Sequence, residues 1–159
     1  MDPRHLIAQA ALETNWGQSL PQDSAGRSSN NLFGIKTSAD WAGAAVTNTT
    51  QEFQNGVASN TSAQFKAYAT PTQSFQDYVA LLRNNPRYST ALNTGSDARA
   101  FAAGLQRGGY ATDPDYANKI AAVASTVAQK VDSTPAAAGT VSDLKLASAL
   151  PIPANTGAL

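Results

Sequence analysis

Residues 6–17 read LIAQAALETNWG, and this stretch decides what kind of domain the chain forms. At 3.6 residues per turn, Leu6, Ala10 and Glu13 follow one another along one side of a helix, so a carboxylate continues an apolar stripe. A mid-helix Glu is more often solvated or paired than buried alone. No Lys or Arg stands four residues before or after Glu13, although a distant Arg could still pair with it. Glu13 is therefore the first candidate for a functional carboxylate.

Trp16 lies about one turn beyond Glu13 and could cover its carboxylate. Burial beside an aromatic ring disfavours ionisation and would raise the pKa of Glu13. Cleavage of a glycosidic bond requires a carboxylic acid that keeps its proton near neutral pH, so that it can act as general acid. The stretch therefore favours glycoside chemistry, with a solvated surface Glu as the competing interpretation.

Helix signals occur on both sides of a polar central segment. Asp2 is a suitable N-cap and Pro3 a suitable first helical residue, and this helix is expected to run to a stop at Gly17. The N-cap residues, apolar spacing and glycine or proline stops further along the chain predict three more helices. These helices cover residues 70–85, 97–108 and 113–127.

Residues 41–68 follow a different pattern and are predicted to form a small antiparallel β-lobe. Thr, Val and Phe are frequent from residue 44 onward, and Asn55-Gly56 is a dipeptide favoured in the type I′ turn of a hairpin. The segment is polar, so it has little apolar surface with which to anchor itself, and low local burial gives low local stability. We expect a mainly α-helical, α+β domain with a mobile β-lobe.

The composition excludes several functions. The 11 Lys and Arg balance the 11 Asp and Glu, so the formal net charge is zero, and only 14% of the chain is charged. Neither nucleic acid nor an anionic membrane is an expected partner, because both attract clustered Lys and Arg. The longest apolar run, residues 100–105, is far shorter than the roughly 18 residues of a membrane span.

Cysteine is absent and His5 is the single histidine, which excludes thiolate and multi-histidine metal sites. We expect neither a metal nor a cofactor. His5 stands in the first turn of its predicted helix and is expected at the surface, with no role in catalysis.

The chain is predicted to divide into a domain at residues 1–131 and a low-complexity tail at residues 132–159. From residue 133 onward there is no aromatic residue, and Asp143 and Lys145 are the only charges. The N-terminal residues lack the apolar segment of a signal peptide. For the oligomeric state, we expect a monomer. The tail could dock as a short helix through an apolar stripe formed by Val141, Leu144, Leu146 and Leu150.

Several separated motifs occur in one order along the chain. After residues 6–17 come NLFGIK at residues 31–36 and TQEF at residues 50–53. FQDYVALLRNNPRY at residues 75–88 and GYATDPDYA at residues 109–117 follow. Together these motifs resemble glycoside hydrolase family 73 and, more narrowly, the peptidoglycan hydrolase domains of flagellar proteins. The resemblance covers roughly residues 3 to 130.

The resemblance implies a lysozyme-like helical fold that cleaves β-1,4 bonds in peptidoglycan glycan strands. The expected activity is that of an endo-β-N-acetylglucosaminidase, which opens the cell wall for assembly of the flagellar rod. A periplasmic location follows from the same resemblance. Flagellar rod proteins would be partners through a domain that this chain does not contain.

The resemblance also assigns catalytic residues. Glu13 corresponds to the family's general acid, Glu52 to a second carboxylate in the β-lobe that is proposed as the base, and Tyr110 to a tyrosine associated with catalysis. From the residues alone, Glu52 could equally be a solvent-facing strand residue. Tyr110 could simply pack its ring into the core.

A groove for a glycan needs aromatic faces for sugar rings and polar groups for hydroxyl and acetamido groups. Trp41 could close over substrate from the lobe, or it could fill the small core of the lobe. Each of the predicted groove residues has packing in the core as its alternative. The predicted substrate-binding residues are Trp16, Asn31, Phe33, Trp41 and Tyr68.

The mechanism depends on how far apart the two carboxyl groups lie. About 5–5.5 Å indicates retention through a covalent intermediate, and roughly 6.5–9.5 Å indicates inversion through a water molecule. We favour inversion, or attack by the 2-acetamido group of the substrate with assistance from Glu52. The alternatives are an N-acetylmuramidase or a lytic transglycosylase on the same substrate, and a non-catalytic glycan-binding or rod-scaffold domain.

Overall fold

The computed structural model describes residues 1–54 and 57–133, and for residues 51–54 and 57–58 it describes the backbone alone. The predicted Asn55-Gly56 turn and nearly all of the predicted tail lie outside the described residues. The elements in chain order are α1 (Pro3–Glu13), β1 (Ala45–Gln54), β2 (Val57–Lys66), α2 (Pro71–Asn84), the 3-10 turn η1 (Pro86–Tyr88), α3 (Ser89–Leu92), α4 (Ala98–Arg107) and α5 (Tyr116–Asp132).

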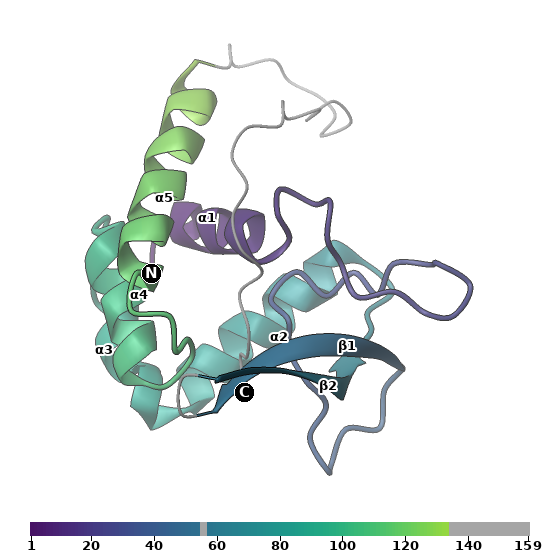
Figure 1. The fold of residues 1–159 in the computed structure, drawn as a ribbon. Helices are drawn as coiled ribbons and strands as arrows, with labels where there is room; N and C mark the ends of the chain where they lie inside the picture. The colour runs from purple at the N-terminus through teal and green to yellow at the C-terminus, as the bar shows by residue number, and fades with distance from the viewer. Residues whose placement is uncertain (55–56, 134–159) are drawn as a thin grey trace.

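The five α-helices of the described residues form a helical body (Figure 1). α5 packs against both α1 and α4, and α4 packs in turn against α3. One face of α5 is apolar at helical spacing, which buries its side chains between the two neighbours. The buried side chains of this face are Tyr116, Ile120, Val123 and Val127.

An aromatic cluster joins the helices to the loop that follows α1. The ring of Phe33 stacks on Tyr78 of α2 with centroids 4.0 Å apart, and Tyr110 meets the edge of Tyr78 at 5.7 Å. Offset and edge-on aromatic pairs add about 0.5–1.5 kcal/mol to the burial of their surface. All three rings belong to the buried core. This cluster fixes the loop of residues 31–36 against α2.

The β-lobe contains an antiparallel ribbon in which β1 pairs with β2 from Ala45 opposite Lys66 to Gln54 opposite Val57. In Figure 1 the ribbon is drawn in front of α2, and at the end of β2 the Lys66 ammonium group pairs with Asp77 of α2 at 2.9 Å. The loop after α1 continues the pairing on the free side of β2, since Thr37 N donates to Gln64 O at 2.9 Å. The predicted antiparallel lobe is thus confirmed.

The helical expectations are confirmed in outline, with corrections at the ends. α1 ends at Glu13 rather than Gly17, and α5 begins at Tyr116 rather than Asp113, after a turn. The spacing had not predicted η1 or α3. Among the described residues, no helix combines the length and the apolar character needed to cross a membrane.

His5 is a second correction, because its side chain is only 2% exposed and packs 5.1 Å from the ring of Phe101 in α4. In the first turn of α1, Pro3 and Arg4 are exposed, whereas His5 is buried against α4, which sequence periodicity alone did not show. The expectation that His5 lies at the surface was therefore wrong.

Candidate active site

Glu13 is the last residue of α1 and is half-buried at the point where the helix leaves the body. The stripe that leads to it is buried as predicted, with Leu6 and Ala10 each 8% exposed. The C-terminal end of a helix carries partial negative charge, which disfavours a further negative charge there. Because Glu13 is half-buried at this end, its carboxyl group stands at the border between the core and the solvent.

The chain turns sharply directly after Glu13, through three residues with positive φ angles. Asn15, Trp16 and Gly17 have φ of 47°, 57° and 83°. This region suits Gly but costs other residues roughly 1–2 kcal/mol each. The Thr14 hydroxyl stabilises the turn, because it donates to Ala10 O at 2.6 Å and accepts from Gly17 N at 2.8 Å. The turn explains why α1 ends at Glu13. Backbone strain of the kind seen at Asn15 and Trp16 is often found at functional sites.

Trp16 is half-buried and packs at the edge of the hydrophobic core. Its backbone N donates to Ala11 O at 2.7 Å, which holds the turn against the end of α1. The residue thus lies close to Glu13 in the chain.

The Tyr116 hydroxyl donates a hydrogen bond to Glu13 Oε1 at 3.3 Å. Burial raises the pKa of the Tyr116 hydroxyl well above its ordinary value, and the negative charge of Glu13 raises it further. Burial likewise raises the pKa of Tyr78 and Tyr110, to which the charge of Glu13 also contributes. Glu13 is thus faced by neutral tyrosine hydroxyls from the body.

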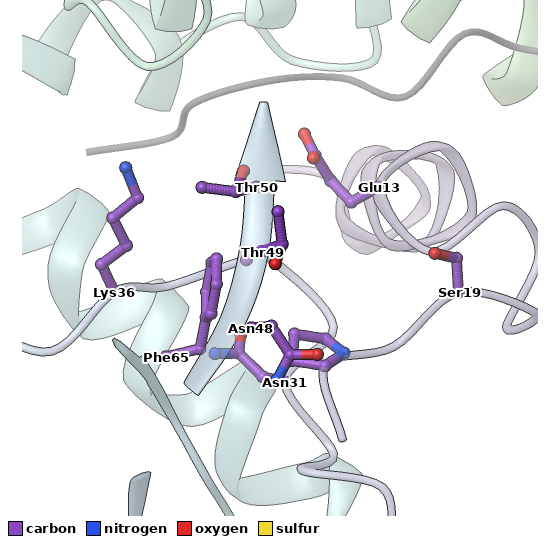
Figure 2. A pocket seen from close by; sticks show the side chains of 10 residues that line it. Glu13, Ser19, Asn31, Lys36, Asn48, Thr49, Thr50 and Phe65 are labelled. Atoms are coloured by element: carbon purple, nitrogen blue, oxygen red, sulfur yellow. The ribbon is translucent and has the colours of Figure 1, made fainter. Parts of the chain in front are cut away.

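A polar hollow opens beside Glu13, between the helical body and β1 (Figure 2). We call it the Glu13 hollow. In Figure 2 the carboxylate of Glu13 and the amine of Lys36 extend toward the same side of the hollow, from either side of β1. A carboxyl group, an ammonium group and several hydroxyl and amide groups thus surround one cavity. Its described lining residues are Glu13, Ser19, Pro21, Asn31, Gly34, Lys36, Asn48, Thr49, Thr50 and Phe65.

Asn31 fixes the floor of this hollow through three hydrogen bonds. Its Nδ2 donates to the carbonyls of Ile35 at 2.8 Å and Lys66 at 2.9 Å, and its Oδ1 accepts from Ile35 N at 3.0 Å. Between these anchor points Gly34 adopts a φ of 61°, which Gly adopts at little cost. Asn31 thus lines the hollow and also ties the loop to β2.

Phe33 and Tyr110 belong to the core beneath the hollow. Phe33 has no exposed surface, so its ring presents no face to a sugar in this conformation. The Tyr110 side chain is 3% exposed, and its hydroxyl donates to Phe33 O at 2.9 Å. Both side chains therefore support the loop that carries Asn31.

Trp41 and Tyr68 lie apart from the Glu13 hollow. Trp41 lines a different hollow together with Gln64 of β2. Its ring is contacted by Lys66 Nζ, 4.3 Å from the centroid, and lies so close to Gly43 that a Cβ there would meet it at 2.3 Å. The Tyr68 hydroxyl donates to Asp77 Oδ2 at 2.6 Å, and burial raises its pKa. These two residues brace the β-lobe against α2.

Glu52 stands in β1, where it pairs with Ser59 of β2, and its side chain lies outside the described residues. In the described part of the chain, no group of three or more His, Asp or Glu side chains is arranged to hold a metal ion.

A family model described as mannosyl-glycoprotein endo-beta-N-acetylglucosaminidase, or glucosaminidase, matches residues 1–129. The chain belongs to the glucosaminidase family. This is a family of glycoside hydrolases, as the sequence motifs predicted.

Solved structures of glucosaminidase-family relatives share the fold. A peptidoglycan hydrolase from Sphingomonas sp. A1 matches with a TM-score of 0.78 and 43% identity, over 82% of this chain and 85% of that chain. The glycoside hydrolase domain of FlgJ from Salmonella typhimurium matches with a TM-score of 0.66 and 40% identity, over 81% of this chain and 85% of that one.

Among curated proteins, the peptidoglycan hydrolase FlgJ of Pseudomonas aeruginosa is 48% identical over 124 residues, which is 78% of this chain. The match covers 31% of that relative's length. This chain thus corresponds to about a third of that longer protein.

Sequence reasoning missed several polar residues of the site. Lys36 stands inside the quoted NLFGIK motif, and the motif itself was the signal that could have singled it out. Asn48 and Thr50 alternate along a polar strand, which could have indicated one face over a groove. The buried Gln9 gave no signal of its own, because its partners lie far away in the chain.

Proposed function

We propose that this domain hydrolyses β-1,4 glycosidic bonds in the glycan strands of peptidoglycan, as an endo-β-N-acetylglucosaminidase with Glu13 as general acid. The observation that carries the proposal is the position of Glu13, half-buried at the end of α1 and opening into a polar hollow. Membership of the glucosaminidase family and the names of the FlgJ relatives support the substrate.

In this proposal the carboxyl O–H bond of Glu13 breaks as its proton passes to the glycosidic oxygen. The bond from that oxygen to the anomeric carbon breaks, and its electron pair stays on the leaving oxygen. A new bond to the anomeric carbon forms from a water oxygen, whose proton passes to the base, or from the acetamido oxygen of the substrate, which water later displaces. Glu13 is left as a carboxylate that accepts the hydrogen bond of Tyr116. Such general acid catalysis contributes about 10²–10⁴-fold to a rate.

Glu52 is proposed as the base that activates water, or as an assistant to attack by the substrate's own 2-acetamido group. It stands two positions beyond Thr50 in β1, and Thr50 lines the Glu13 hollow. Asn48 and Thr49 of the same strand also line this hollow, and the position of Glu52 in that strand supports the assignment. Inversion and acetamido participation are favoured over a covalent glycosyl-enzyme, because a base on a mobile lobe suits a wide gap between the carboxyl groups.

The glycan is proposed to bind in the Glu13 hollow, where hydroxyl and amide side chains match the hydrogen-bonding groups of amino sugars. Of the predicted binding residues, Asn31 lines this hollow, and Trp16 stands in the turn that directly follows Glu13. Phe33 and Tyr110 are proposed to act from below, by holding the loop at residues 31–36 in place. Trp41 and Tyr68 are proposed to support the lobe.

The setting proposed for this reaction is extracytoplasmic, in the periplasm, where the domain opens the cell wall for the flagellar rod. The FlgJ relatives support this setting. Rod proteins are proposed as partners through a domain outside this chain, and the domain is proposed to act as a monomer.

A second candidate is N-acetylmuramidase activity on the same strands. The observation that favours it is a relative from Lactococcus lactis named as a probable N-acetylmuramidase, which is 36% identical over 119 residues. The two activities differ in which of the two alternating sugars provides the new reducing end.

Mass spectrometry of borohydride-reduced digests of purified sacculi tests both candidates. The proposal predicts fragments that end in reduced N-acetylglucosamine, and none of these from Glu13→Gln. Reduced N-acetylmuramic acid ends would support the second candidate. 1,6-Anhydro ends would show a lytic transglycosylase. A complete lack of released fragments would leave a non-catalytic binding or scaffold domain as the remaining interpretation. Either of these two results would overturn the proposal.

A further inference from the structure

A chain of hydrogen bonds runs through the core and ends at Glu13. Gln9 is the central link, a glutamine with no exposed surface that lies one turn before Glu13 in α1. The Tyr78 hydroxyl donates to Gln9 Oε1 at 2.7 Å, and Gln9 Nε2 donates to the Tyr116 oxygen at 2.9 Å. The Tyr116 hydroxyl then donates to Glu13 Oε1 at 3.3 Å.

The chain has one direction, which the amide of Gln9 sets. An amide has a distinct acceptor end and donor end, whereas a hydroxyl carries one proton and can rotate to suit its neighbours. Because Gln9 Nε2 donates to Tyr116, the Tyr116 oxygen acts as an acceptor there and its single proton is available for Glu13. With the amide reversed, Gln9 Oε1 would face Tyr116 and would compete with Glu13 for the single Tyr116 proton.

From this geometry we propose that Gln9 is a positioning residue for the catalytic acid. Gln9 orients the Tyr116 hydroxyl, and the hydroxyl in turn fixes the carboxyl group of Glu13. The inference rests on the proposed role of Glu13 as general acid.

The arrangement determines where the acid proton sits. Oε1 of Glu13 is occupied as an acceptor from Tyr116, so the proton of the neutral acid resides on Oε2. When that proton passes to the leaving oxygen, the negative charge that develops on Glu13 meets a donor that already points at it. Such preorganised donors stabilise a transition state without reorganising during the reaction.

Satisfying buried tyrosines does not by itself explain Gln9. Tyr88 is buried in the same core, and its hydroxyl has no hydrogen-bond partner among the described residues. Both ring nitrogens of the buried His5 also meet none there. This core therefore tolerates polar atoms without partners, and an apolar side chain at position 9 would avoid the cost of burying an amide.

The direction of the chain holds across the working pH range. Burial raises the pKa of Tyr78 and Tyr116 well above the ordinary value, so both stay protonated donors. The ionisable groups around Glu13 are Tyr78 from α2, Tyr110 from the loop before α5, Tyr116 from α5, and Lys36, which shares its hollow. Of these groups, Tyr116 donates a hydrogen bond to the Glu13 carboxyl oxygen.

The experiment compares Gln9→Met and Tyr116→Phe with Tyr88→Phe. The last variant is the matched control, because it removes a buried hydroxyl group that is not part of the chain of hydrogen bonds. Rates are measured on solubilised glycan strands as a function of pH and substrate concentration. We expect Gln9→Met and Tyr116→Phe each to lower kcat about ten- to a hundredfold, the range for a hydrogen bond to a charged group. KM should change little, because neither side chain is exposed to substrate. Tyr88→Phe should keep the wild-type kcat.

The pH profile separates positioning from a purely structural role. Tyr116 stabilises the charged form of Glu13, so its loss should move the alkaline limb of kcat to higher pH. Gln9→Met should move the limb in the same direction, and the double variant should lose no more activity than Tyr116→Phe alone.

An unmoved alkaline limb with wild-type kcat in Gln9→Met would overturn the inference, as would losses that multiply in the double variant. If Gln9→Met does not fold, Tyr116→Phe carries the test, because it removes a single oxygen atom. Glu13→Gln is measured alongside: if that variant is active, the proposed function fails, whereas an inactive Glu13→Gln with normal Gln9→Met rejects the role of Gln9 alone.

Discussion

The helical body and the β-lobe hold their shapes by different means. In α5, four side chains along one face are buried against α1 and α4. Among the strand side chains that the structure describes, Val46 and Phe65 are buried and the others are exposed or half-exposed. The proposed acid, Glu13, is carried by the body, whereas the proposed base, Glu52, is carried by the lobe.

This difference indicates how a cleft enzyme can combine a fixed acid with a movable partner. Low burial predicts that the lobe opens at a lower free energy than the body unfolds. Polar contacts join the two regions. They include the Asn31 bonds to the loop and to β2, the contact of Asn48 with Gln22, and the bond of Tyr68 to Asp77 in α2.

Leu105→Ala should lower the free energy of unfolding of the body by about 2–5 kcal/mol, since Leu105 is fully buried in α4 and its loss leaves a cavity. Val46→Ala removes two methyl groups from the lobe and should cost at most about 2 kcal/mol. Urea unfolding with amide hydrogen exchange measures both. If Val46→Ala speeds exchange equally in α5 and β1, the two regions unfold together and the division is wrong.

Asn31→Ala should destabilise the contact between its loop and β2 by about 1–3 kcal/mol, because the variant leaves buried backbone groups without their side-chain partner. Amide exchange should speed up in β2 and at Ile35 while α5 stays protected. Asn84→Ala, at the exposed end of α2, is the matched control and should change little. If the two variants changed amide exchange in β2 equally, Asn31 would not be the residue that holds the loop to β2.

Asn48→Ala should destabilise the contact between β1 and the loop at Gln22 by about 0.5–1.5 kcal/mol. The Asn48 Nδ2 donates to Gln22 O at 2.8 Å, and its Oδ1 accepts from Gln22 N at 3.4 Å. Faster exchange is expected in β1 and around Gln22, measured by mass spectrometry. The neighbouring exposed Thr47→Ala serves as control, and identical exchange in the two variants would contradict the prediction.

The start of the body should show a small acid sensitivity. Hydrogen bonds from the Arg4 side chain and backbone lower the pKa of Asp2 from 3.8 to about 2. A lowered pKa in the folded state gives stability that is present above 3.8 and is lost as the pH falls toward about 2.

Asp2→Asn keeps an N-cap of similar quality but removes this titration. Thermal midpoints of the wild type and the variant should therefore converge between these two pH values. A constant difference between them at every pH would show that Asp2 does not titrate in this way.

Local signals in the sequence predicted most of the fold. The Asp2, Thr70 and Asp97 caps accept the expected backbone hydrogen bonds, and the polar hairpin formed where the pattern changed. The end of α1 was mispredicted because Thr14 and a strained turn stop the helix before Gly17. His5 was misplaced because burial there depends on packing between distant helices.

In the candidate site, too, local patterns could be predicted from the sequence and contacts between distant segments could not. Glu13 was identified from a break in an apolar stripe, a purely local pattern. Gln9 was not, because Tyr78 and Tyr116 are 69 and 107 residues away from it in sequence. Trp41 stays a predicted substrate-binding residue, and its contacts with Gly43 and Lys66 could not be predicted from its residue type.

The measurement that tests the central claim most directly is the rate of clearing of purified sacculi by Glu13→Gln and by Glu52→Gln, with folding of both checked by circular dichroism. With the acid fixed on the body, Glu13→Gln should lose about 10²–10⁴-fold in rate. Glu52→Gln should lose less if the acetamido group of the substrate takes part. Clearing at the wild-type rate by a folded Glu13→Gln would contradict the account.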